Sequence, residues 1–191
     1  KSRSVNKSKK SKIHVVHKAN VMKITDGIFL DACRHILSKY NDVDYEEMLV
    51  DSCAAHLVRK PDQFDVILTT NMFGDILSDL ATELSGSLGL AGSLNTGNNH
   101  AMAQAQHGAA PDIAGKNIAN PISLILSSAM LLDWLGKNRE IDKLILASNL
   151  INDSVLELLK DRENFTRDLG GNASTSKITE NLIKILNKII K

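Results

Sequence analysis

The feature of this sequence that most constrains its fold is a short apolar run followed closely by a segment with helical spacing, a pair that occurs twice. Residues 13–17 are centred on β-branched side chains, which predicts a strand, and residues 25–39 then carry apolar side chains at helical intervals. Residues 65–70 predict a second, buried strand, followed by a tight turn at 71–74 and a helix at 75–84. Repeated strand and helix pairs predict an α/β fold with several helices covering a few strands.

The other segments are predicted to be helices and loops. Helices are predicted at four more segments: residues 46–59, where apolar side chains have helical spacing, 121–136, a long apolar segment that Pro121 opens, and 141–159 and 175–190. Polar and glycine-rich composition predicts irregular or loop structure at residues 40–45, 86–100 and 104–120. We assign a function to the last of these loops, because it combines His, Gly, Pro and Asp within a few residues.

Composition excludes several classes of protein. The chain has 191 residues, of which 43% are hydrophobic and 24% charged, so it is able to bury a core. Two cysteines, Cys33 and Cys53, cannot form a disulfide framework and favour a reducing compartment. The best apolar stretch, residues 122–135, is interrupted by Ser127, Ser128 and Asp133, which predicts a core helix and no membrane span.

Charge is unevenly distributed along the chain. The first twelve residues carry six basic side chains and no acidic one, although the net charge of the whole chain is only +1. A solvated connector, a nucleic-acid-binding arm and a targeting segment are all compatible with such a run. We expect no nucleic-acid partner, because the run lacks the interleaved aromatic side chains on which bases stack.

The strongest local constellation is a pair of carboxylates. The sequence contains no GxGxxG, Walker, GxSxG, HExxH or CxxC motif. Asp75 and Asp79 are separated by one helical turn, at the start of a helix that follows a buried strand. Two oxygen ligands at the carboxyl end of a strand would suit Mg²⁺ or Mn²⁺. The alternative is that Asp75 caps the helix and Asp79 is a solvated surface acid.

Four ordered motifs, from about residue 13 to the C-terminus, resemble the metal-dependent β-decarboxylating dehydrogenases of the isocitrate and 3-isopropylmalate type. The motifs are His17-Lys18-Ala19-Asn20-Val21, Asn71-Met72-Phe73-Gly74-Asp75-Ile76-Leu77-Ser78-Asp79-Leu80 with Gly86-Ser87-Leu88-Gly89-Leu90, His107-Gly108-Ala109-Ala110-Pro111-Asp112-Ile113-Ala114-Gly115-Lys116 with Ile118-Ala119-Asn120-Pro121, and Asp168-Leu169-Gly170-Gly171. The resemblance implies an isocitrate/isopropylmalate dehydrogenase-like two-domain α/β fold, with a mixed sheet flanked by helices and distinct from a Rossmann fold.

The resemblance implies a metal and catalytic site. Asp75 and Asp79 are expected to bind Mg²⁺ or Mn²⁺, together with Asp51 contributed across a dimer interface. Lys18 and Asp51 are the expected catalytic residues, with Lys18 transferring protons at the substrate's hydroxyl and enolate. Lys18 and Asn20 are expected to contact the substrate, and Asn20 also the nicotinamide.

The resemblance also implies a cofactor loop in place of Rossmann glycines. Asp112 would bind the adenosine ribose hydroxyls and repel a 2′-phosphate, which favours NAD over NADP. Besides Asn20, the residues expected to bind the cofactor are His107, Gly108, Ala109, Ala110, Pro111, Asp112 and Asn120.

We therefore expect a two-domain chain with a dehydrogenase function. Residues 1–84 would be part of the smaller domain, which forms the dimer and carries catalytic residues, and residues 85–191 the return segment of the nucleotide-binding domain. The expected reaction is NAD-dependent oxidative decarboxylation of a 2-hydroxy-3-carboxy acid, with isocitrate favoured over homoisocitrate, 3-isopropylmalate and tartrate. The family's substrate-reading arginines and catalytic tyrosine precede the part of the family that this chain matches.

Two further expectations follow. The enzyme would be a homodimer with sites shared across its interface, in the cytoplasm or, in a eukaryote, the mitochondrial matrix. The alternative function is a non-catalytic regulatory subunit of a hetero-oligomeric NAD isocitrate dehydrogenase, although the joint presence of Lys18, Asp51, Asp75 and Asp79 speaks against it.

Overall fold

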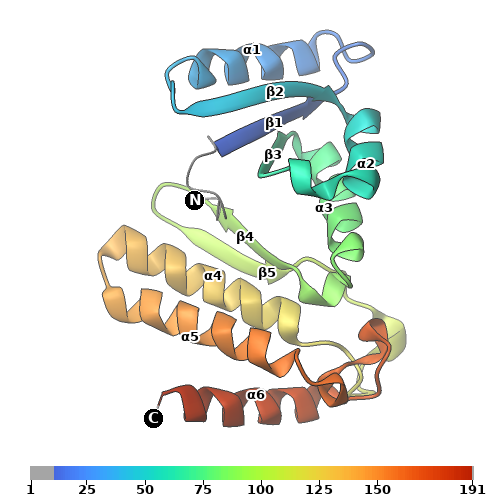
Figure 1. Ribbon diagram of the computed structural model, residues 1–191, viewed down its shortest axis with the longest axis vertical. Helices are drawn as coiled ribbons and strands as arrows, with labels where there is room; N and C mark the ends of the chain where they lie inside the picture. The colour runs from blue at the N-terminus through green and yellow to red at the C-terminus, as the bar shows by residue number, and fades with distance from the viewer. Residues whose placement is uncertain (1–10, 191) are drawn as a thin grey trace. The chain divides into compact units, whose positions relative to one another are not determined.

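A computed structural model describes residues 11–190 of the chain (Figure 1). Most of the basic run at residues 1–12 lies outside the described residues. The chain divides into two compact units, Lys1–Leu84 and Ser85–Lys191, coloured blue to green and green to red in Figure 1. The domain roles that the sequence predicts for these two segments stay predictions.

The first unit contains a three-stranded parallel sheet. Its strands are β1 (Ser11–His17), β2 (Val43–Leu49) and β3 (Val66–Thr69), in the order β2-β1-β3. Successive side chains of the central strand β1 point to opposite faces of the sheet, so each face receives its own apolar residue. Val15 packs in one core cluster and Val16 in another.

Helices cover both faces of this sheet. Helix α1 (Thr25–Leu37) packs its Leu30, Cys33 and Leu37 around Val15. Helices α2 (Val50–Arg59) and α3 (Asn71–Leu84) pack Cys53, Leu57 and Leu77 around Val16 on the other face. A 3₁₀ turn (Pro61–Gln63) follows α2. Parallel strands with helices on both faces confirm the predicted α/β class.

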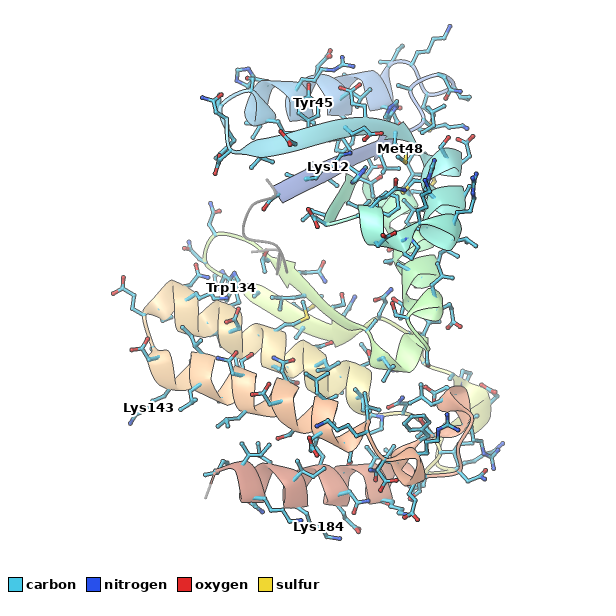
Figure 2. The ribbon with its side chains drawn as sticks, viewed as in Figure 1. Lys12, Tyr45, Met48, Trp134, Lys143 and Lys184 are labelled. Atoms are coloured by element: carbon cyan, nitrogen blue, oxygen red, sulfur yellow. The ribbon has the colours of Figure 1, made fainter. Side chains whose placement is uncertain are left out.

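The sequence predicts a polar loop at residues 40–45 and a helix from residue 46, and both predictions are wrong at residues 43–49. These residues form strand β2, and helix α2 begins only at Val50. The strand includes the acidic residues Asp44, Glu46 and Glu47, and it lies at an edge of the sheet, where charged side chains are tolerated. Both glutamates of β2 have cationic partners: Arg34 Nε lies 2.7 Å from Glu47 Oε1, and Lys12 Nζ lies 2.5 Å from Glu46 Oε2. Figure 2 labels Lys12 on β1 and two other side chains of β2, those of Tyr45 and Met48.

The start of α3 is the second correction. Residues 71–74 were expected to form a tight turn, but α3 begins at Asn71, and the backbone N–H of Gly74 donates to the carbonyl of Thr70 at 2.8 Å. Asp75 therefore lies one turn inside the helix, so it does not cap the N-terminus. This finding removes the capping alternative for Asp75.

The second unit combines an antiparallel hairpin with three long helices. Strands β4 (Gly92–Thr96) and β5 (Ala101–Ala105) pair with each other, and the described helices are α4 (Ile122–Arg139), α5 (Asp142–Leu158) and α6 (Thr175–Ile189). The three predicted helices of this region are thus confirmed. Short 3₁₀ turns occupy Leu88–Leu90, Pro111–Ile113, Arg162–Asn164 and Arg167–Leu169.

The sequence interpretation places β4 and the last two residues of β5 in irregular or loop segments, and this is wrong for a local reason. Its strands consist mostly of Gly, Ser, Ala, Asn and Gln, which have weak strand propensity. Two buried serines of α4 form hydrogen bonds with the backbone of the hairpin and of the residue before it. Ser123 Oγ donates to the carbonyl of Ala91. Ser127 Oγ donates to the carbonyl of Gln104 at 2.7 Å and accepts from the Ser93 N–H at 3.0 Å. Tertiary hydrogen bonds therefore stabilise the hairpin.

The core of the second unit lies among its helices. Ile122 of α4, Val155 and Leu158 of α5, and Ile178 and Leu182 of α6 are buried together. Among the helices in the described part of the chain, none combines the length and apolar character that crossing a bilayer requires.

Candidate functional site

Lys18 and Asp51 form an ion pair at one end of the parallel sheet. Lys18 follows the last residue of β1, and Asp51 lies in the first turn of α2. Lys18 Nζ donates to Asp51 Oδ1 at 2.5 Å, and this hydrogen bond lowers the pKa of the Asp51 carboxyl. Both side chains reach solvent, with exposed fractions of 27% and 62%. The structure thus brings together the two predicted catalytic residues within one chain.

Asp26 holds the backbone at Lys18. Its carboxylate is 2% exposed, and Oδ2 accepts a hydrogen bond from the Lys18 N–H at 2.6 Å. The carbonyl of Lys18 accepts from the N–H groups of Val21 and Met22, which closes a tight turn. The sequence interpretation missed Asp26. The sequence signal that could have identified Asp26 is its position: it is an acidic residue in the first turn of the helix that follows the His17 to Val21 motif.

His17 and Asn20, which flank Lys18, differ in burial: His17 is half-buried and Asn20 is exposed. His17 Nδ1 accepts the N–H of Ala19 at 3.0 Å, so this ring nitrogen carries no proton. The side chain of Asn20 is exposed. His14 is buried and His17 is half-buried.

Asp75 and Asp79 lie one turn apart on α3, and both are exposed. Two carboxylates on one helix face are the hard oxygen donors that Mg²⁺ and Mn²⁺ take, so the donor types fit such an ion. Within residues 11–190, no three His, Cys, Asp or Glu side chains gather closely enough to hold a metal. Asp51 is thus not a third ligand beside Asp75 and Asp79 in one chain, and the predicted metal site stays a prediction.

The predicted cofactor loop is an exposed, tightly turned segment. Ala110 has a left-handed backbone (φ 43°) and precedes the 3₁₀ turn Pro111–Ile113, whose middle residue is the exposed Asp112. His107 Nδ1 lies 3.0 Å from the carbonyl of Gly108. A Cβ built on Gly108 would meet no described heavy atom within 4 Å, so a ligand could approach the backbone there. An exposed carboxylate and open backbone fit a dinucleotide.

Hydrogen bonds of Asn117 connect this loop to the first turn of α6. Asn117 Nδ2 donates to Ser176 Oγ at 2.8 Å, and Asn117 Oδ1 accepts the Ser176 N–H at 3.1 Å. The Thr175 hydroxyl donates to the carbonyl of Ala119 at 2.6 Å. Sequence reasoning missed this anchor, because its partners are almost sixty residues apart.

Asn120 ends the loop and contacts Asp168. Asn120 Nδ2 donates to Asp168 Oδ2 at 2.9 Å, and Ser87 Oγ donates to the same oxygen at 2.5 Å. Burial acts to raise the pKa of Asp168, but hydrogen bonds led by those from Asn120 and Ser87 hold it below its ordinary value. Asp168 belongs to the last of the four sequence motifs, which by itself predicts no role for this residue.

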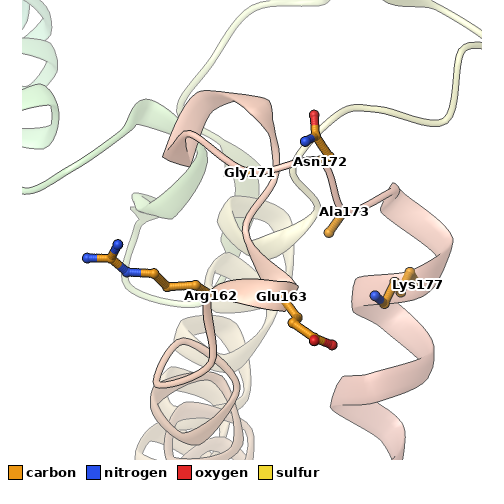
Figure 3. A pocket seen from close by; sticks show the side chains of 6 residues that line it. All are labelled: Arg162, Glu163, Gly171, Asn172, Ala173 and Lys177. Atoms are coloured by element: carbon orange, nitrogen blue, oxygen red, sulfur yellow. The ribbon is translucent and has the colours of Figure 1, made fainter.

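A pocket of about 330 Å³ lies elsewhere in the second unit (Figure 3). It contains none of the predicted site residues, and Figure 3 shows the Arg162 side chain directed away from those of Glu163 and Lys177. Its lining residues are Arg162, Glu163, Gly171, Asn172, Ala173 and Lys177.

Most of this chain is similar in sequence to known proteins. The profile of the family described as isocitrate/isopropylmalate dehydrogenase matches residues 3–182. The chain is 46% identical over 181 residues to a 3-isopropylmalate dehydrogenase of Sulfurisphaera tokodaii, covering 95% of this chain and 52% of that protein. It is 44% identical over 177 residues to an isocitrate/homoisocitrate dehydrogenase of Thermus thermophilus, covering 93% and 51%.

A solved structure shows the same fold. The crystal structure of isocitrate dehydrogenase from Methylococcus capsulatus matches with a TM-score of 0.85 and 40% identity, over 92% of this chain and 50% of that one. The chain thus spans about half the length of the relatives it matches. The predicted resemblance and fold are confirmed, and the chain belongs to the isocitrate/isopropylmalate dehydrogenase family.

Proposed function

We propose that the protein is an NAD-dependent and Mg²⁺- or Mn²⁺-dependent dehydrogenase that oxidises and decarboxylates a 2-hydroxy-3-carboxy acid, with isocitrate as its substrate. It would act as a homodimer, in the cytoplasm or in the mitochondrial matrix of a eukaryotic cell. The observation that carries this proposal is the Lys18–Asp51 pair, with 2.5 Å between Nζ and Oδ1.

Lys18 has the chemistry that the reaction requires. Oxidation removes a proton from the substrate hydroxyl and a hydride from its carbon. Decarboxylation then breaks the bond to the 3-carboxylate, and the resulting enolate takes a proton at carbon. Lys18 would accept the hydroxyl proton at the neutral amine, and the ammonium so formed would return a proton to the enolate. The group is solvent-accessible and lies 2.5 Å from Asp51, which would hold it in place for both transfers. Asp26 keeps the backbone of Lys18 in position during both transfers.

Asp75 and Asp79 would hold the divalent cation, which when bound supplies electrophilic stabilisation of the substrate oxygen. Their carboxylates point from one face of α3, and Asp51 of the other protomer would complete the ligand set. Asp51 is half of an ion pair with Lys18, so one protomer would deliver both residues together to the site of its partner.

The loop from His107 to Asn120 would hold NAD, which when bound accepts the hydride. Its contacts would come from the residues named above: Asp112 would accept hydrogen bonds from the ribose hydroxyls, and Asn120 would meet the adenine. Asn20, exposed beside Lys18, would contact the substrate and the nicotinamide.

The experiment that tests the proposal is a substrate panel on the intact protein. Isocitrate, homoisocitrate, 3-isopropylmalate and tartrate are compared with NAD and Mn²⁺, and NADH formation is measured. We expect kcat/KM to be highest for isocitrate, by about tenfold or more. If another acid of the panel has the highest kcat/KM, that acid takes the place of isocitrate as the proposed substrate, and the proposed reaction class stands. Cofactor binding without turnover of any acid would support the regulatory-subunit alternative.

A further inference from the structure

The Asp168 carboxylate is presented by a rigid turn. The 3₁₀ turn Arg167–Leu169 is closed by hydrogen bonds from the N–H groups of Gly170 and Gly171, to the carbonyls of Arg167 at 3.0 Å and of Thr166 at 2.8 Å. A Cβ on Gly171 would lie 2.1 Å from the carbonyl oxygen of Phe165, so this position has room only for glycine. The backbone from which the Asp168 side chain extends is therefore held in one conformation.

This carboxylate joins segments that lie far apart in the sequence. Its Oδ2 accepts hydrogen bonds from Ser87 and Asn120, which lie 81 and 48 residues away. Ser87 Oγ in turn accepts the N–H of Gly89 at 3.0 Å. A Cβ on Gly89 would lie 2.6 Å from Asp168 Oδ2 and 2.7 Å from Asn120 Nδ2, so there is no room for a side chain between residue 89 and this contact.

These contacts determine which way the Asn120 carboxamide faces. Its Oδ1 accepts the Ile122 N–H, the first of α4, at 3.0 Å, and its Nδ2 faces Asp168. A carboxylate only accepts hydrogen bonds, so a flipped carboxamide would place oxygen against oxygen. One amide hydrogen and one oxygen lone pair of Asn120 remain for a ligand.

We propose that Asp168 is a positioning residue for the dinucleotide: it holds the Asn120 carboxamide in one orientation, so that the remaining N–H and oxygen match the acceptor and donor of adenine. This inference rests on the proposed function of the cofactor loop. An asparagine carboxamide is complementary to the acceptor and amino donor on an adenine edge only when its two ends are in the right order. Asp168 acts through Asn120 and does not itself contact the cofactor.

Deamino-NAD is the probe that separates positioning from a structural role. On its Watson–Crick edge, hypoxanthine presents a donor where adenine has an acceptor and an acceptor where adenine has a donor. A carboxamide held in one orientation should therefore favour NAD, whereas one free to flip should accept both. In the intact protein we expect kcat/KM to favour NAD by roughly tenfold, and Asp168→Ala to reduce that ratio to roughly twofold or less.

Kinetics of the single variants complete the test. Asp168→Ala should raise KM for NAD roughly tenfold, with kcat changed by less than about threefold. In an Asn120→Ala background, Asp168→Ala should add less than about twofold, because its effect passes through Asn120. Asp161→Ala is the matched control, because Asp161 caps a neighbouring 3₁₀ turn by accepting the Glu163 N–H at 3.0 Å. This variant should leave both the preference for NAD over deamino-NAD and the KM for NAD unchanged.

Each outcome has one meaning. An unchanged preference for NAD over deamino-NAD in Asp168→Ala, or an equal rise in KM with and without Asn120, would overturn the positioning role. If Asn120→Ala leaves KM for NAD unchanged, the proposed cofactor loop fails instead. If Asp168→Ala does not fold, Asp168→Asn, which keeps the acceptor oxygen and removes the charge, is put through the same cycle. It should show a smaller loss of preference, which Asn120→Ala again abolishes.

Discussion

The ammonium of Lys18 lies 2.5 Å from Oδ1 of Asp51, which ties the end of β1 to the first turn of α2 within one chain. Both residues belong to the site that we propose, and their pairing makes them a single unit that one protomer contributes.

Replacing Lys18 should abolish most turnover without unfolding the protein. Lys18→Ala in the intact protein is expected to lower kcat by about a thousandfold, since a positioned proton-transfer group is lost. Lys12→Ala is the matched control, because Lys12 also forms an ion pair at 2.5 Å, with Glu46 on the same sheet. The control should keep kcat within about twofold, as is usual for exposed ion pairs. Comparable losses in both variants would refute the catalytic role of Lys18.

Neutralising Asp75 should weaken metal activation. In Asp75→Asn a carboxylate ligand becomes a neutral amide, and the Mn²⁺ concentration for half-maximal activity is expected to rise by more than about tenfold. Asp62→Asn, at an exposed aspartate in the 3₁₀ turn Pro61–Gln63, serves as the control and should leave that concentration unchanged. The measurement is initial rate against Mn²⁺, and an unshifted curve for Asp75→Asn argues against a metal site on α3.

Reversing the charge at position 112 should narrow the cofactor preference. Asp112 is exposed in the turn Pro111–Ile113, and its negative charge would repel a 2′-phosphate. Asp112→Lys is expected to reduce the ratio of kcat/KM for NAD to that for NADP by about tenfold or more. Asp153→Lys, on the exposed side of α5, makes the same charge change outside the loop. Equal ratios in the two variants would mean that the loop is assigned wrongly.

Mixed dimers test whether sites are shared. If Lys18 and Asp51 of one protomer serve Asp79 of the other, co-expressed Lys18→Ala and Asp79→Asn chains should recover about a quarter of the activity, since each heterodimer holds one intact site. Lys18→Ala mixed with Asp51→Asn should recover nothing, because both residues come from the same protomer. Recovery in the second mixture, or its absence in the first, would contradict shared sites.

His14 should make stability depend on pH. The ring is 1% exposed, and neither of its nitrogens has a hydrogen-bond partner among residues 11–190. The Phe64 ring packs edge-on against it, with 4.6 Å between the ring centroids. Burial, with the nearby charge of Lys12, lowers the pKa of His14 in the folded chain, against opposing effects of Glu46 and Asp65. The unfolded chain therefore binds more protons just below the ordinary histidine pKa of about 6.5. Stability should be complete above that pH and fall as the pH is lowered.

Thermal unfolding between about pH 8 and pH 5 measures this effect, with an expected loss of up to about 1.4 kcal/mol for each pH unit below 6.5. His14→Val, which matches the neighbouring valines at 15 and 16, should remove most of this dependence. His35→Gln is the control at an exposed histidine of α1 and should leave it intact. A pH profile unchanged by His14→Val would show that another group is responsible.

Local sequence determined those elements whose formation depends on nearby residues. The β-branched run around Val15 and Val16 predicted a strand, and the long apolar segment that follows Pro121 predicted α4. Such signals lie within consecutive residues, so the sequence alone shows them. The motifs around Lys18, Asp75 and Asp112 likewise identified candidate site residues and the family.

Tertiary structure decided what depends on distant partners. Strand β2 exists because its polar residues lie at a sheet edge beside Arg34 and Lys12, and the β4–β5 hairpin because buried serines of α4 complete its hydrogen bonds. The contact of Asp168 with Asn120 spans 48 residues, so no local pattern could show it. Hydrogen-bond partners of this kind are chosen by the folded chain, which alone brings together groups that a linear motif leaves far apart.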